Sequence, residues 1–126
     1  MWVVIFRAQV RQLNNDYSRT AQRMRELALT QFGCLAFHAV TEGSEEVALS
    51  YWPDPASIAA WRAHPEHLEA QRLGRERWYR RWSVEVAQVQ RSYQGESRVP
   101  SGGNSGGNFV GDPGRDPGGD PPTQTA

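Results

Sequence analysis

The stretch WVVIF at residues 2–6 is apolar at every position and rich in β-branched residues, which predicts a strand over 2–11. Successive side chains of a strand point to opposite faces of its sheet, so both faces of this strand require burial. One layer of helices covers only one face. We therefore expect a second copy of the chain to cover the other face, because self-association is the simplest symmetric solution.

The chain after this strand alternates between helical and extended patterns. Apolar residues with helical period predict a helix that is capped at Asn14, Asn15 or Asp16, runs to about Gln31 and ends at Gly33. Strands are predicted at 34–40 (CLAFHAV) and 47–52 (VALSYW), with the turn TEGSEE between them.

Two helices with proline at their first position follow the third strand. Asp54 is the predicted cap before Pro55, and His64 is the predicted cap before Pro65. The second of these helices is expected over 65–81, and a last strand is expected over 83–93. The order βαββαβ predicts an α+β, ferredoxin-like fold, in which a four-stranded antiparallel sheet carries both helical segments on one face.

The composition changes sharply near Gln94. Residues 95–126 are dominated by Gly, Pro, Ser, Asn and Asp, a composition that buries too little apolar surface to offset its chain entropy. We therefore expect one folded domain over 1–94 and a disordered tail over 95–126.

Charge and cysteine content narrow the environment and the partners. The 14 basic and 14 acidic residues balance, which gives no electrostatic case for binding nucleic acid or a membrane. A lone cysteine, Cys34, forms no internal disulfide, so a reducing, cytoplasmic location is expected. The short apolar start is interpreted as a strand and not as a signal peptide or a membrane span.

A polar stripe on the predicted helix 65–81 is the candidate site. Helical spacing sets His67, Gln71 and Trp78 on one side, with Arg75 beside them. One interpretation is the solvated edge of helix-to-sheet packing. The other is the polar wall of an aromatic-floored pocket that binds a planar ligand. The motif HPEH also suggests a metal site. His64 is explained as a helix cap, however, and we expect no metal.

The same residues resemble the antibiotic biosynthesis monooxygenase domains of the dimeric α+β barrel superfamily. The resemblance rests on LSYW (49–52), AWRAHPEHLEAQRLGRERWY (60–79) and VEVAQVQRSY (84–93), and RMRELALTQFGCLAF (23–37) is similar to the family's first helix and second strand. It implies a homodimer with a pocket between sheet and helices in each subunit. It also implies cofactor-independent oxygenation, with dioxygen, of a small electron-rich aromatic such as a quinol or a polyketide-like compound.

A haem-degrading branch of the superfamily carries an Asn on its first strand, a Trp and an iron-ligating His. Trp61 matches that Trp, but Gln71 stands at the His position and Arg7 at or near the Asn position. An amide is a poor haem ligand, so haem degradation is the weaker alternative and no cofactor is expected.

For cofactor-free oxygenation the expected catalytic residues are His67, Arg75 and Gln71. Neutral His67 would act as base, Arg75 would hold the developing oxyanion and Gln71 would orient a carbonyl. The residues expected to bind the substrate are Trp52, Trp61, His64 and Trp78. Trp61 and Trp78 would also exclude water. The alternative function is a protein of the same fold that binds a small aromatic without turnover.

Overall fold

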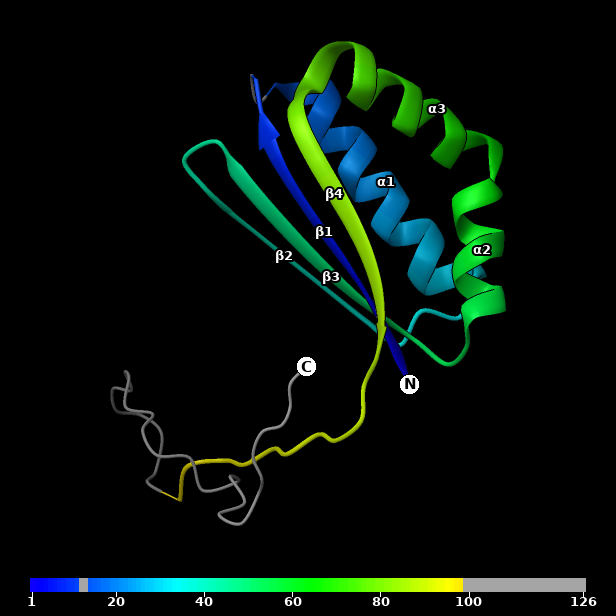
Figure 1. Ribbon diagram of the computed structural model, residues 1–126, viewed down its shortest axis with the longest axis vertical. Helices are drawn as coiled ribbons and strands as arrows, with labels where there is room; N and C mark the ends of the chain where they lie inside the picture. Colours follow the sequence, from blue (N-terminus) through cyan, green and yellow to red (C-terminus); the bar gives the residue numbers. More distant parts are fainter. Residues whose placement is uncertain (12–13, 99–126) are drawn as a thin grey trace. The chain divides into compact units, whose positions relative to one another are not determined.

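Eight elements follow one another in residues 1–11 and 14–98, the part of the chain that the computed structural model describes (Figure 1). They are β1 (Trp2–Val10), α1 (Asn15–Gln31), β2 (Ala36–Glu42), β3 (Glu45–Trp52), α2 (Pro55–Ala63), α3 (Pro65–Leu73), the π-helix η1 (Gly74–Trp78) and β4 (Tyr79–Gln88).

The four strands form one antiparallel sheet in the order β2-β3-β1-β4. The apolar strand β1 lies in the interior of the sheet, where β3 and β4 pair with its two edges. All three α-helices lie over the same face of the sheet (Figure 1). The predicted α+β, ferredoxin-like architecture is confirmed.

The three α-helices begin directly after predicted capping residues. Asn14 Oδ1 accepts a hydrogen bond from Tyr17 N, Asp54 Oδ1 accepts one from Ser57 N, and the His64 ring accepts one from Glu66 N. Each bond satisfies a backbone donor that has no partner within the helix. The backbone kinks at His64 between α2 and α3, as the sequence predicted.

The core lies between the helices and one face of the sheet. Trp52 and Leu27 are completely buried, and Trp61 stacks on Trp52 with ring centroids 5.0 Å apart. The strand alternation sets every second residue of β1 toward this core, from Val4 to Val10.

The region after α3 differs from the prediction of a helix over 65–81 and a strand over 83–93. The α-helix ends at Leu73, a π-helical turn covers Gly74–Trp78, and β4 already begins at Tyr79. Trp and Tyr favour a strand over a helix interior once they can pack on a sheet, and here they pack on β1 and α1. Tertiary packing therefore overrides the helical spacing of the charged residues.

A register shift between β1 and β4 re-aims two aromatic side chains. Val10 is opposite Tyr79 while Gln9 is opposite Arg81, so Arg80 is an extra residue on β4. Such a bulge changes the face on which the next side chains lie. Tyr79 and Trp82 consequently share the helix-covered face, with ring centroids 6.2 Å apart.

Smaller differences occur at the second and third strands. β2 begins at Ala36, after Cys34 and Leu35, and extends to Glu42, so the turn is tighter than predicted and centres on Gly43, whose φ is 62°. β3 begins at Glu45, which brings Glu46 into the strand.

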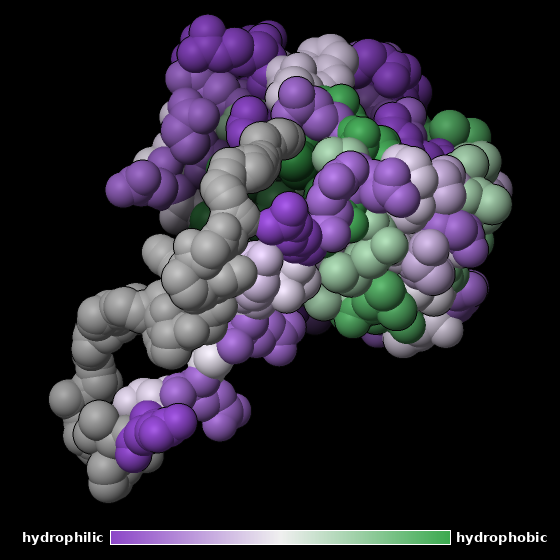
Figure 2. Space-filling view, turned by 60° about the horizontal axis from the view of Figure 1, so that its bottom comes forward, coloured by the Kyte–Doolittle hydropathy of each residue, from purple (hydrophilic) through white to green (hydrophobic). Residues whose placement is uncertain are grey.

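Apolar side chains reach the surface in patches between hydrophilic residues (Figure 2). Four of the large ones on the surface are Leu29, Leu35, Val40 and Val86. The face of the sheet away from the helices carries further half-buried apolar side chains: Val3, Ile5, Val47, Leu49 and Tyr51. The sequence predicts that a second copy of the chain covers this face.

One compact unit spans Met1–Val89. The described residues after it, 90–98, form no helix or strand. Most of the predicted disordered tail, from 99 on, lies outside the described residues. Within the described ranges, no helix is long and apolar enough to cross a membrane.

Candidate functional site

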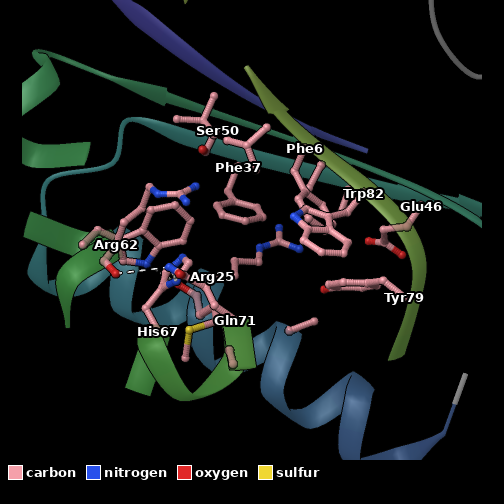
Figure 3. Close-up of a pocket in the computed structure, with 18 of the residues that line it drawn as sticks. Phe6, Arg25, Phe37, Glu46, Ser50, Arg62, His67, Gln71, Tyr79 and Trp82 are labelled. Carbon is pink, nitrogen blue, oxygen red and sulfur yellow. Dashed lines mark hydrogen bonds between the residues drawn. The ribbon is translucent and has the colours of Figure 1, made fainter. Parts of the chain in front are cut away.

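A cavity of about 620 Å³ opens between the helix-covered face of the sheet and the helices (Figure 3). All four strands, the three α-helices and η1 contribute to its wall. The lining mixes aromatic and aliphatic side chains with a few polar ones, as a site for a small planar ligand requires. The polar side chains are Tyr17, Gln22, Arg25, Glu46, Ser50, Arg62, His67, Gln71, Arg75 and Tyr79.

His67 and Gln71 lie at one end of this cavity (Figure 3), and the His67 ring lies beside Trp61. Gln71 Nε2 lies 3.0 Å from His67 Nδ1 and donates to the backbone oxygen of Arg62 at 3.3 Å. The edge of the Trp61 indole meets the imidazole, with centroids 4.4 Å apart and an interplanar angle of 86°. The imidazole is therefore held on two sides.

These contacts select one tautomer of the imidazole. The bond to the Arg62 carbonyl requires the amide nitrogen of Gln71, and not its oxygen, at this position. The same nitrogen then donates to His67 Nδ1, so the proton of the neutral ring lies on Nε2. Burial lowers the pKa of His67 to about 4, and the nearby positive charge of Arg62 also lowers it. His67 is therefore a neutral hydrogen-bond donor at neutral pH.

The lowered pKa of His67 predicts a loss of stability in mild acid. Between pH 6.5 and 4 the unfolded chain binds a proton at this ring that the folded chain does not, so stability is lost as pH falls through this window. We expect this group to lower the free energy of unfolding by about 1 to 2 kcal/mol between pH 7 and 5.

Urea unfolding at these two pH values tests the expectation. His67→Gln should remove that part of the pH dependence, whereas His38→Gln, an exposed histidine on β2, should keep it. An equal pH dependence in the wild type and His67→Gln would contradict the buried neutral ring.

Arg25 reaches the middle of the cavity from α1 (Figure 3). Its guanidinium carbon lies 5.8 Å from the centroid of the Phe37 ring, a cation–π distance. Within the described residues Arg25 has no ion-pair partner, so its donors remain available to a ligand. Arg25 was not among the predicted site residues, although it lies four positions after Ala21, which also lines the cavity from the same helix.

The other end of the cavity is formed by Glu46, Tyr79 and Trp82 (Figure 3), together with Tyr17. Glu46 is 8% exposed, and its Oε1 accepts a hydrogen bond of 2.7 Å from Thr41 on β2. Burial raises the pKa of the Tyr79 hydroxyl to about 12, and the charge of Glu46 acts in the same direction. Burial, followed by neighbouring Tyr79 and Glu46, also raises the pKa of Tyr17, so both hydroxyls stay protonated.

The structure brings four of the seven predicted site residues to the cavity wall: His67, Gln71, Arg75 and Trp61. The other three lie behind the wall. Trp52 is fully buried and bonds to Ser50, Trp78 packs against Tyr17 at 5.2 Å, and His64 caps α3. Trp78 turns away because the π-helix ends the helical spacing that aligned it with His67.

Cys34 is buried and does not line the cavity. Burial raises the pKa of the Cys34 thiol, and its Sγ donates to Ala36 O, so the thiol is a core group. Among the residues that the structure describes, no three His, Cys, Asp or Glu side chains gather in a way that could hold a metal.

Comparisons with known proteins identify the family of this chain. Residues 1–73 match the family described as antibiotic biosynthesis monooxygenase. The uncharacterized protein YqjZ of Bacillus subtilis (strain 168) is 37% identical over 91 residues, which are 71% of this chain and 80% of YqjZ.

Solved structures share the fold at low sequence identity. SnoaB, a cofactor-independent oxygenase from Streptomyces nogalater, has a TM-score of 0.62 and 14% identity, covering 72% of this chain and 94% of SnoaB. A conserved protein from Methanosarcina mazei Go1 has a TM-score of 0.61 and 16% identity, covering 69% and 90%. With a family match over more than half of its residues and a relative at 37% identity, this chain belongs to the antibiotic biosynthesis monooxygenase family.

Proposed function

We propose that the protein is a cofactor-independent monooxygenase that oxidises a small electron-rich aromatic compound, such as a quinol or a polyketide-like phenol, in the cavity. The observation that carries this proposal is the set of cationic and neutral donors, Arg25, Arg75 and His67, on the wall of a largely apolar cavity. Family membership and the likeness to the oxygenase SnoaB support it.

The proposed reaction uses the electrons of the substrate in place of those of a cofactor. The substrate loses its proton to solvent and binds as an anion, which transfers one electron to dioxygen. The resulting radical and superoxide combine through a new carbon–oxygen bond, and the peroxide takes up a proton. Loss of water then converts a ring CH₂ and O₂ into C=O and H₂O. The protein must stabilise the anion and keep bulk water from it.

The proposed role of His67 is that of a hydrogen-bond donor to the substrate oxygen. Action as a base at Nε2 would need the other tautomer, and thus a flip of the Gln71 amide that breaks its bond to Arg62 O. The pKa near 4 also makes protonation of this ring costly. Gln71 accordingly positions the imidazole, while Trp61 supplies an apolar wall beside it.

Oxygen uptake with a panel of naphthols and quinols tests the proposal. We expect uptake by the wild type and at least a tenfold lower kcat/KM for His67→Ala, since a buried donor to a developing charge is lost. Gln31→Ala, at an exposed position of α1 that does not line the cavity, is the control and should behave as wild type. Binding of these compounds without any oxygen uptake would instead establish the alternative, a non-catalytic binding protein.

We also propose a cytoplasmic location, because a lone buried cysteine suits a reducing compartment.

A homodimer joined through the uncovered face of the sheet is a further proposal. Ile5 and Leu49 are opposite each other in the centre of that face. Sedimentation equilibrium should give a dimer for the wild type, and Leu49→Arg should give a monomer because it places a charge in the apolar interface. A monomeric wild type at micromolar concentration would overturn this assembly.

A further inference from the structure

Glu46 is an unusual group to find in the wall of this cavity. Only 8% of it is exposed, yet no Arg or His of the described residues forms an ion pair with it, and the chain has no lysine. Its hydrogen-bond donors are two neutral hydroxyls, that of Thr41 at 2.7 Å and that of Tyr17. A carboxylate has about four lone-pair sites, so two donors leave acceptor capacity for a ligand in the cavity that Glu46 lines.

The backbone directs this carboxylate into the cavity. Glu46 is opposite Ala8 on β1 and Thr41 on β2, and the alternation of β3 sets it on the same face as Ala48 and Ser50, which also line the cavity. Its neighbour in sequence, Glu45, lies on the opposite face and is exposed. Glu46 is therefore the acidic member of the lining, at the end away from His67 (Figure 3).

Tyr17 and Tyr79 complete this end of the cavity. Their rings meet edge to face, with centroids 6.1 Å apart, and the Tyr79 ring also packs 5.5 Å from Phe6. The ring of Tyr79 lies directly on the backbone of Gly74: a methyl group there would lie 2.8 Å from Tyr79 Cδ2 and closer still to Cε2. Gly74 thus makes room for the ring that walls this end.

The two ends of the cavity have opposite hydrogen-bonding character. At one end the His67 Nε2–H is a hydrogen-bond donor, so a carbonyl or an oxyanion of a ligand fits at that end. The Arg25 guanidinium supplies further donors between the two ends. At the other end the Glu46 carboxylate is an acceptor, so a ligand hydroxyl fits there. The apolar walls between them suit an aromatic ring.

We propose that Glu46 forms a second polar subsite that accepts a hydrogen bond from a phenolic hydroxyl, so that the preferred ligands carry a carbonyl or oxyanion at one end and a free hydroxyl at the other. This inference rests on the proposed function and assigns Glu46 as a residue that determines specificity for a ligand hydroxyl. The site requires no turnover, so binding alone tests it.

The test compares 6-hydroxy-1-tetralone with its methyl ether, two ketones that differ only in the hydroxyl, by titration calorimetry under nitrogen. We expect the wild-type full chain to bind the hydroxy compound at least tenfold more tightly. Glu46→Gln should reduce this preference to about threefold or less, and Glu46→Asp should give an intermediate value. Glu45→Gln on the opposite face is the matched control and should keep the wild-type preference.

Two outcomes would overturn the subsite: a wild type that binds both ketones equally, which is independent of how any variant folds, or a Glu46→Gln variant with a wild-type melting temperature and an unchanged preference. Failure of the proposed oxygenase is a separate result, namely absent oxygen uptake together with an intact preference for the hydroxy ketone.

Discussion

Replacement of Trp61 by Ala is expected to lower the free energy of unfolding by about 3 to 5 kcal/mol, the range typical of a large aromatic removed from a core. Trp61 is 5% exposed and joins three parts of the molecule. Its ring contacts Trp52 and Phe37 on the sheet, and its Nε1 donates to Met24 O on α1 at 3.1 Å. The existing cavity beside it leaves no side chain positioned to fill the space.

Urea unfolding followed by far-UV circular dichroism measures this effect. The matched control is Trp82→Ala, since Trp82 also lines the cavity but is 46% exposed, and its loss should cost less than about 1 kcal/mol. Similar losses for the two variants would show that Trp61 does not join the helices to the sheet as described.

Replacement of Arg25 by Met is expected to lower kcat/KM for oxygen uptake by roughly 100-fold, the effect of removing one preorganised group from a developing anion. Met keeps much of the apolar stem and removes the charge that lies over the Phe37 ring. The free energy of unfolding should change little, because Arg25 is exposed on α1 and forms no ion pair within the described residues.

Arg19→Met is the control on the same helix, because Arg19 is exposed and pairs with Asp16 at 2.7 Å, away from the cavity. It should retain wild-type kcat/KM. Arg25→Lys should recover part of the rate, since it restores the charge without the planar donors. Wild-type kcat/KM in Arg25→Met would remove Arg25 from the proposed mechanism and leave Arg75 as the cation for the oxyanion.

Local signals in the sequence determined the order of the elements and where the helices begin. Asn14, Asp54 and His64 satisfy the first backbone donors of their helices by short-range contacts, and these contacts are visible in the sequence. The apolar run of β1 determined that it lies inside the sheet. His67 and Gln71 were found because a helix brings residues four apart together.

The tertiary structure alone decided where the last helix ends and which residues form the far end of the cavity. Residues 74–82 have a helical spacing of charges, but Trp78 and Tyr79 gain more by packing on β1 and α1, and the extra residue Arg80 then turns Tyr79 inward. Glu46 looked like part of a polar turn. It became a buried carboxylate because β3 begins at Glu45 and its alternation, counted back from Trp52, faces the cavity. Both results depend on strand register, which long-range pairing sets and local sequence does not.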